Sequence, residues 1–372
     1  MKIKLTHKDI SEVSNKLGKL ITGNLAIPVL KGILVKAEES AIMFTASDGT
    51  DTIIVRLQVE GETRQVIEAG SIVIAREALA IAKKLTGEIV LKLDGTNLLV
   101  EQDKSKFSFP TMAADEYPLI NTDNAKLKYI ISGAEFESFV KKTTFAASDS
   151  DSRPVLQAVN MSFSKEEKRY CSTDSHRLAL VTSEGDESIP EDERFEINVP
   201  AKSLEQAVKS FDLTKDVIMM ATNNDITLAN GNTIMICRLI EGNYPDTRRL
   251  IPDSTPFTLR INRKELMDAL EILQSLDKSG VVKLTVGTLF VELLASGEGN
   301  RGIREIAFEE WNGEEKFSIS FSSKYILETL KSYEGATSIN LGLTDVMKPI
   351  ILTNPKDDNS LQLVLPIRNI NN

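Results

Sequence analysis

Short segments of alternating apolar and polar residues fill much of the chain, and a few stretches with helical periodicity interrupt them. Within residues 33–60, the segments ILVKA, AIMFTAS and TIIVRLQVE alternate with period two, as expected for half-buried strands. Residues 6–21 differ, because their apolar positions recur at steps of three and four residues, as on one face of a helix. Those positions are Ile10, Val13, Leu17, Leu20 and Ile21.

This pattern repeats along the chain. Asp48, within ASDGTDTI, and Asp174, within STDSHRLA, are 126 positions apart, and the Tyr-Pro pairs at 117–118 and 244–245 are 127 apart. A fainter third copy covers residues 294–333. Each unit is long enough to bury a core of its own. The repeat therefore predicts three domains, at residues 1–124, 125–252 and 253–372.

Each repeat has the same order of elements: a strand, an amphipathic helix, alternating strands, a second helix and a closing hairpin. Thr6, Ser132 and Asn262 precede the first helix of each repeat and are good N-cap residues. Antiparallel sheets covered by a helix pair form an α+β fold. The sequence thus predicts three tandem copies of one α+β unit, each with two helices packed on antiparallel sheets.

Composition indicates a globular, non-membrane protein without cofactor chemistry. The chain is 41% hydrophobic and 26% charged, and no apolar run reaches the roughly 18 residues of a membrane helix. The start, MKIKLTHKDI, lacks the apolar region of a signal peptide, and the only cysteines are Cys171 and Cys237, so a reducing, cytoplasmic location is expected. With only His7 and His176 beside them, we expect no metal centre.

The net charge of −10 argues against a nucleic-acid partner, yet charge is unevenly distributed. The six helical stretches (6–21, 75–86, 132–145, 200–211, 262–276 and 322–333) together carry +4, which leaves −14 for the remainder. A helical lysine usually lies on a solvated face. Helices from three repeats placed side by side would nevertheless form a mildly basic face suited to a phosphate backbone. Its candidate residues are Lys8, Lys16, Lys83, Lys141, Lys202, Lys209, Lys324 and Lys331.

Several apparent catalytic motifs have simpler interpretations. Residues 297–302 spell G-x-G-x-x-G, but the following IREIAF alternates like a strand, so a hairpin turn is favoured over a dinucleotide site. Asp149 and Asp151 lack the glycine and closing glutamate of a calcium loop. No catalytic residues are therefore assigned.

Asp174 and His176 include residue types of a hydrolytic triad, but neighbours on a strand point to opposite faces. A structural or binding histidine is the favoured interpretation. A hydrolase or nuclease using these two residues remains the rival hypothesis. Cys171 and His176 lack a second pair of ligands with matching spacing for a metal.

Five motifs in order resemble the bacterial DNA polymerase III beta subunit family, the replicative sliding clamps. They are FPTMAADEYP (109–118), SRPVLQAVN (152–160), STDSHRLAL (172–180), EGNYPDTRRLIP (241–252) and the terminal LPIR (365–368). The resemblance implies three DNA-clamp domains per chain and a head-to-tail homodimer, a ring with helices around duplex DNA. It also implies a non-enzymatic processivity factor without cofactors. Its partners would be the polymerase III catalytic subunit, the clamp loader and repair factors.

The same resemblance assigns site residues. An apolar slot with a few polar groups would receive a short peptide with Leu, Phe and Gln side chains. Ring closure would join Phe107 and Phe109 to Ile272 and Leu273, although a plain core role is open for each. The slot would consist of Leu156, Thr173, His176, Arg177, Leu178, Pro245, Arg249, Leu250, Tyr325, Met347, Leu363, Val364, Leu365, Pro366, Ile367 and Arg368.

Three features depart from the family pattern. Gly23-Asn24 stands where many relatives carry a DNA-contacting cation, the stretch 262–276 carries a net −1, and residues 369–372 extend the chain beside the slot. An accessory or mobile-element clamp with a restricted set of partners is therefore the alternative. A monomeric interaction module that has lost ring closure is a third hypothesis.

Overall fold

The computed structural model describes residues 1–18, 20, 25, 27–118, 127–187, 189–190, 194–276, 280–297, 299–313 and 316–368. Gly23-Asn24 and residues 369–372 lie outside this part of the chain. The described residues form two compact units, Met1–Glu137 with Lys202–Leu239, and Ser138–Ala201 with Ile240–Asn372. The middle repeat contributes strands to both units, and the predicted boundaries between the three domains remain a prediction.

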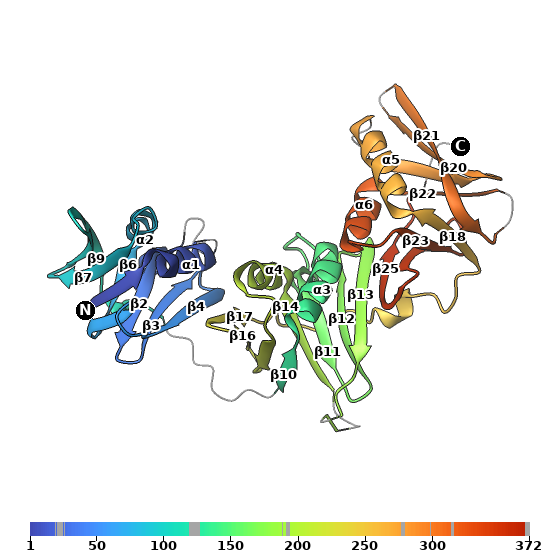
Figure 1. Cartoon of the computed structure of the whole chain (residues 1–372). Coiled ribbons are helices and arrows are strands. Elements are labelled where there is room, and N and C mark those ends of the chain that lie inside the picture. Colours follow the sequence, from blue (N-terminus) through green and yellow to red (C-terminus); the bar gives the residue numbers. More distant parts are fainter. Residues whose placement is uncertain are drawn as a thin grey trace. The chain divides into compact units, whose positions relative to one another are not determined.

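The first unit is built on one antiparallel sheet, to which 13 strands belong among the described residues (Figure 1). Helices α1 (His7–Leu17) and α2 (Arg76–Ala82) belong to this unit. The strand order is β10-β15-β16-β17-β4-β3-β2-β6-β9-β8-β7-β1-β5. The strands are β1 (Lys2–Thr6), β2 (Gly32–Glu38), β3 (Ala41–Ser47), β4 (Asp51–Gln58), β5 (Gln65–Glu68), β6 (Gly70–Ala75), β7 (Glu88–Asp94), β8 (Asn97–Gln102), β9 (Ser105–Met112), β10 (Leu127–Ile131), β15 (Val217–Ala221), β16 (Asp225–Asn230) and β17 (Thr233–Arg238).

The second unit has a sheet with 12 strands in the part that the structure describes, ordered β14-β11-β12-β13-β25-β24-β23-β18-β21-β20-β19-β22. Helices α5 (Arg263–Leu276) and α6 (Ser323–Ser332) pack on it. The strands are β11 (Ala158–Phe163), β12 (Glu167–Thr173), β13 (Arg177–Glu184), β14 (Phe195–Pro200), β18 (Phe257–Asn262), β19 (Val281–Val286), β20 (Phe290–Gly297), β21 (Asn300–Trp311), β22 (Phe317–Ser322), β23 (Ser338–Leu343), β24 (Ile350–Asn354) and β25 (Asp357–Val364).

The remaining helices belong to the middle repeat or are single turns. They are α3 (Gly133–Thr143), α4 (Ala201–Ser210) and the 3₁₀ turns η1 (Pro28–Lys31), η2 (Ala114–Glu116), η3 (Thr144–Ala146), η4 (Pro154–Gln157) and η5 (Arg248–Leu250). Each repeat thus has two α-helices among strands, which confirms the predicted α+β class.

Neighbouring repeats are joined by strand pairing. In the first unit β17 pairs with β4, so that Cys237 lies opposite Asp51. In the second unit β13 pairs with β25, and Leu178 lies opposite Leu363. Both joints are antiparallel, so each sheet continues from one repeat into the next without an edge at the joint.

The predicted N-caps are present. Thr6 and Asp9 form a reciprocal capping box at α1. Ser132 and Asn262 each accept a hydrogen bond from the backbone N–H three residues later. One helix end differs from the prediction: α1 ends at Leu17 with Gly18 as its C-cap, although the periodicity continues to residue 21. Leu20 is still buried, so the apolar position is used without the helix.

The G-x-G-x-x-G sequence is confirmed as a hairpin rather than a strand-to-helix turn. Gly297 ends β20, Asn300 begins β21, and the two residues pair. Gly299 has a φ of 86°, a left-handed conformation that favours glycine.

Candidate peptide-binding site and nucleic-acid surface

The joint between β13 and β25 brings predicted slot residues from distant parts of the sequence together. Leu178 and Leu363 pack with Cys171 and Ile351 in one buried cluster. Leu156, Thr173 and Val364 are also buried. These side chains support the slot from within, and a bound peptide would meet other residues.

The segment 174–176 forms a turn between β12 and β13, and not part of a strand as predicted. One carboxylate oxygen of Asp174 accepts the backbone N–H groups of His176 and Arg177 at 2.9 and 3.0 Å. Ser175 has a φ of 77°, an uncommon conformation for a residue with a side chain. The Asp174 carboxylate therefore holds the turn.

The side chains of this turn do not form a hydrolytic triad. The second oxygen of Asp174 accepts from Nε of Arg177 at 2.9 Å. The His176 ring stacks on Tyr325, with 6.1 Å between ring centroids and 17° between planes. These contacts support the binding interpretation of His176 over the hydrolase hypothesis.

Among the predicted slot residues, Arg177 is a polar group with a fixed position. Its buried guanidinium also pairs with Glu328 on α6. It lies over the Tyr325 ring at 4.7 Å from the centroid and near the Phe145 ring at 5.3 Å. A guanidinium that is paired and stacked in this way has a single orientation. Phe145 and Glu328 were not predicted, since only the tertiary structure brings them to Arg177.

Thr173 and Tyr244 fix the opposite end of the turn. The Thr173 hydroxyl donates to the Arg177 carbonyl at 2.6 Å, and the Thr173 backbone N–H donates to the Tyr244 hydroxyl oxygen at 3.0 Å. Burial raises the pKa of Tyr244 well above its ordinary value, so its hydroxyl stays protonated. Pro245 and Arg249 follow on the surface, where Arg249 pairs with Asp246 at 2.9 Å.

The chain end provides the exposed apolar part of the slot. The backbone N–H of Leu365 donates to the His176 carbonyl at 2.9 Å, and that of Ile367 donates to the Ser320 carbonyl at 2.7 Å. Leu365 is 39% exposed and Met347 is 48% exposed. Leu250, also predicted, is half exposed. Such side chains can contact an apolar ligand without any rearrangement.

Next to this chain end lies a cavity of about 440 Å³, which we call the tail cavity. Met347, Ile367 and Arg368 were predicted for the slot, whereas Lys283 and Ser318 were not. The full lining is Lys283, Ser318, Ile319, Ser320, Val346, Met347, Ile367 and Arg368. The tail cavity therefore combines an apolar wall with two cations and several hydroxyls.

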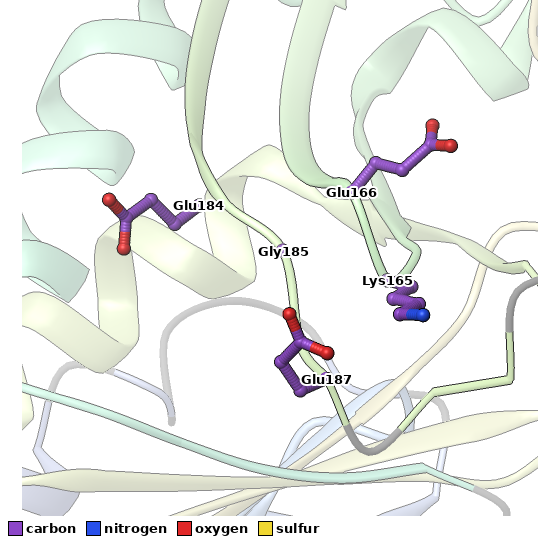
Figure 2. Close-up of a pocket in the computed structure, with 5 residues that line it drawn as sticks. All are labelled: Lys165, Glu166, Glu184, Gly185 and Glu187. Atoms are coloured by element: carbon purple, nitrogen blue, oxygen red, sulfur yellow. The ribbon is translucent and has the colours of Figure 1, made fainter.

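Another cavity, of about 470 Å³, lies between the β11–β12 turn and the end of β13 and contains none of the predicted residues. Figure 2 shows its carboxylates from Glu166 and Glu184 pointing away from each other. Its other lining residues are Lys165, Gly185 and Glu187. We assign no function to it.

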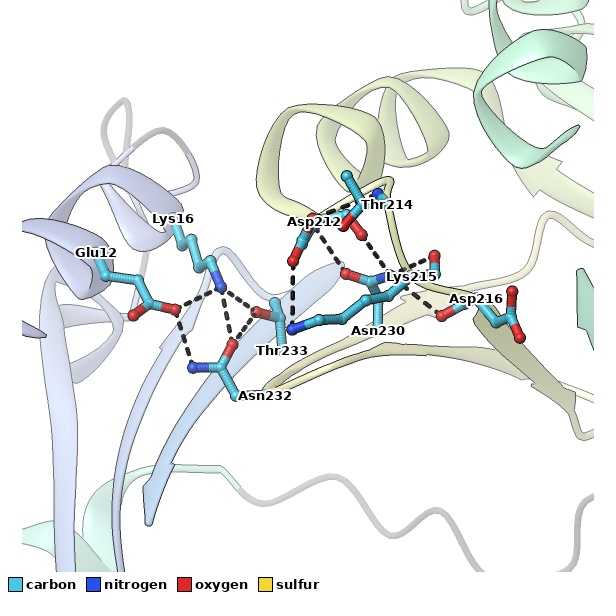
Figure 3. A network of polar contacts seen from close by, with 9 residues as sticks. All are labelled: Glu12, Lys16, Asp212, Thr214, Lys215, Asp216, Asn230, Asn232 and Thr233. Carbon is cyan, nitrogen blue, oxygen red and sulfur yellow. Dashed lines mark hydrogen bonds and ion pairs between the residues drawn. The ribbon is translucent and has the colours of Figure 1, made fainter. Parts of the chain in front are cut away.

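Most lysines predicted to face DNA are exposed, whereas Lys16 is partly buried and held by contacts within the chain. Its ammonium group donates to Glu12 at 2.8 Å, Asn232 at 2.9 Å and Thr233 at 2.8 Å, as Figure 3 shows. Lys16 thus joins α1 to the β16–β17 hairpin within the first unit, and its contact with DNA stays a prediction.

The other predicted cations fall into two groups. Lys83 is partly buried and donates to Asn15 at 2.7 Å. Surface carboxylates lie 3.5 to 3.9 Å from Lys141, Lys209 and Lys331, and such exposed pairs are weak. The exposed residues are Lys8, Lys141, Lys202, Lys209, Lys324 and Lys331.

The predicted ring-closing residues differ in exposure. Ile272 on α5 is 48% exposed and Phe107 on β9 is also exposed, whereas Phe109 is partly buried. Leu273 is only 1% exposed and belongs to the core beneath α5, so its assignment to a partner surface is wrong. Leu276, one turn beyond Ile272, is also exposed.

Comparisons with known proteins cover the whole chain. Profiles of the DNA polymerase III beta subunit match its N-terminal domain at residues 1–121, its central domain at 130–246 and its C-terminal domain at 248–368. The beta sliding clamp of Bacillus subtilis strain 168 is 31% identical over 380 residues, which is 99% of this chain and 100% of that protein.

Further similar proteins are also sliding clamps. The beta sliding clamp of Staphylococcus epidermidis RP62A is 32% identical over 375 residues, or 96% of this chain and 97% of that protein. The crystal structure of the Bacillus subtilis DNA polymerase sliding clamp has a TM-score of 0.91, with 30% identity and 99% of both chains covered.

These findings define the class as a three-domain clamp of antiparallel sheets and helix pairs. The chain belongs to the DNA polymerase III beta subunit family and is a DNA sliding clamp. None of the helices in the described residues is both long and apolar enough to cross a membrane.

Proposed function

We propose that two copies of this chain close head to tail into a ring around duplex DNA and tether the replicative polymerase. The polymerase III catalytic subunit, the clamp loader and repair factors would each dock a short peptide in the slot between His176, Met347 and Leu365. The exposed apolar chain end beside a fixed, buried arginine supports this proposal most directly. The cytoplasm, where the chromosome is copied, is the location that goes with this function.

A ring stays on DNA by topology, so its helices need only tolerate phosphates. Within the described residues, exposed predicted lysines on four of the six helices would provide a loose, sequence-independent attraction. The acidic remainder of the chain limits non-specific binding elsewhere. Tethering raises the local concentration of a partner at the DNA without any catalytic step. We therefore propose a processivity factor and not an enzyme, with no cofactor.

Binding of a fluorescent peptide of the Gln-Leu-x-Leu-Phe type tests this proposal. We expect micromolar or tighter binding to the intact protein, measured by fluorescence anisotropy. Leu365→Asp and Met347→Glu place a charge on the exposed apolar surface, and each should weaken binding about tenfold or more, equivalent to about 1.4 kcal/mol. Ile130→Asp, at an exposed apolar residue of β10, is the matched control and should bind normally. Absence of binding by the intact protein would contradict the proposed slot.

A further inference from the structure

We propose that a partner docked in the slot continues past the tail cavity over the adjacent sheet and places a basic side chain between Glu292 and Glu305. The inference rests on the proposed function, because it extends the same binding site. It assigns a second contact to a cavity of about 390 Å³, which we call the hairpin cavity. The hairpin cavity is lined by Thr285, Gly287, Thr288, Leu289, Phe290, Glu292 and Glu305.

Strand register places both cavities on one face of the sheet. Val282, Leu284 and Val286 of β19 point into the core, so Lys283 and Thr285 between them occupy the opposite face. Across β22, β19, β20 and β21 that face carries two successive rows. The first row is Ser320, Lys283, Leu294 and Ile303, and the second is Ser318, Thr285, Glu292 and Glu305.

The two cavities are adjacent. Ser318 lines the tail cavity and Thr285 lines the hairpin cavity, and their hydroxyls are hydrogen-bonded at 3.0 Å. Lys283 and Thr285 are two residues apart on one strand, a spacing of about 7 Å. An extended segment of the partner also rises by about 3.3 Å per residue, so about two of its residues span the step from one cavity to the other.

The charges in the hairpin cavity favour a basic side chain from the partner. Glu292 lies directly opposite Glu305 in the β20–β21 ladder, and like charges in this position destabilise a sheet. No cation in the described part of the chain forms an ion pair with either carboxylate. A lysine or arginine from a ligand would pair with both and remove the repulsion.

The remaining surface specifies the neighbours of that basic residue. Leu289 is 69% exposed and Phe290 is 51% exposed, so an apolar side chain can pack beside the two carboxylates. Lys283 and Arg368 line the tail cavity and favour an acidic residue there. The face therefore fits an extended segment in which an acidic residue lies near the slot and a basic residue, followed by an apolar one, lies farther out.

Peptide extension tests the inference. The probes are the Gln-Leu-x-Leu-Phe peptide and two longer forms that carry Asp-Ser-Lys-Leu after its C-terminus or the reverse order before its N-terminus. We expect one longer form to bind about five- to tenfold more tightly at low salt, with the gain declining as salt rises. Changing its Lys to Glu should remove the gain.

Variants locate the contact. Glu292→Gln with Glu305→Gln should abolish the gain from the extension and leave binding of the short peptide unchanged. Glu62→Gln with Glu187→Gln removes the same charge from other exposed positions and should preserve the gain. If the wild-type protein does not bind the short peptide, the proposed function itself is refuted. Normal short-peptide binding without a gain, or with a gain that survives in the first double variant, would overturn only this inference.

Discussion

Asp51 is a buried carboxylate at the joint between β4 and β17, and no cation among the described residues forms an ion pair with it. Its two oxygens accept hydrogen bonds from the Ser203 hydroxyl on α4 at 2.8 and 2.7 Å. The Cys237 thiol faces it from β17, and Asp48 adds a second negative charge. Burial raises the pKa of Asp51 to about 6, although the Ser203 hydrogen bond opposes this shift.

This shift predicts that stability falls as pH rises from about 4 to 6. In that window the folded protein holds the Asp51 proton and the unfolded chain has lost it, so the free energy of unfolding decreases up to about pH 6 and then stays level. Asp51→Asn keeps an uncharged side chain at all pH values. It should be more stable than wild type at pH 8 by about 2 to 3 kcal/mol and should lack this slope.

Urea unfolding of the protein at several pH values measures this effect on the unfolding free energy. Asp115→Asn, at an exposed acidic residue, is the control and should keep the wild-type slope. The assignment is wrong if Asp51→Asn and wild type show the same dependence of unfolding free energy on pH.

Local residue roles could be predicted from the sequence, whereas distant ones could not. Thr6, Ser132 and Asn262 cap helices that start at the next residue, so their partners lie within three positions. Asp51 and Ser203 are 152 positions apart, and Arg177 and Glu328 are 151 apart. Only strand pairing between repeats brings these side chains together, and no local pattern encodes that pairing.

At the scale of elements, α1 is fixed to the neighbouring repeat by polar contacts. Lys16 donates to Asn232 and Thr233 at the start of β17, and Asn232 also donates to Glu12 at 2.9 Å. The network supplements the β4–β17 ladder, in which Thr233 pairs with Val55. A lysine held by three acceptors contributes to the stability of this joint.

We therefore predict opposite effects for two lysines of α1. Lys16→Met leaves Glu12 with Asn232 as its only partner in the network and should lower the unfolding free energy by about 1 to 3 kcal/mol. Lys8→Met, at an exposed position, should leave stability within about 0.5 kcal/mol of wild type. Lys8→Met should instead reduce the salt dependence of binding to duplex DNA.

Thermal unfolding and DNA binding at several salt concentrations separate these effects. If Lys16→Met binds DNA more weakly yet unfolds normally, the lysine contacts phosphate and the structural assignment fails.

Hydrophobic periodicity was sufficient for the type and order of elements but not for their ends or pairing. The end of α1 was placed too late because Leu20 is buried outside the helix as well. The segment 174–176, treated as part of a strand, is a turn because the Asp174 carboxylate accepts backbone N–H groups within it. The division of the middle repeat between two sheets depends on tertiary packing, which the repeat length does not reveal.

For the whole molecule, the proposed ring closure would depend on apolar side chains that one chain leaves exposed. Phe107 on β9 and Ile272 and Leu276 on α5 meet this requirement, whereas Leu273 fills the core below α5. Neighbouring positions on a single helix turn thus have different roles. Substitution at Ile272 tests association, and substitution at Leu273 tests folding.

Size-exclusion chromatography with light scattering distinguishes the two roles. The wild type should have twice the 41.1 kDa mass of one chain at micromolar concentration. Ile272→Asp with Leu276→Asp should give a folded monomer, because both side chains are exposed. Its thermal stability should equal that of a wild-type monomer. Leu273→Ala should lower the unfolding free energy by about 2 to 5 kcal/mol through a core cavity while its folded fraction still dimerises.

A monomeric wild type would support the interaction-module hypothesis, since a ring cannot close from single chains. A dimer that persists in the double aspartate variant would move the association surface away from α5.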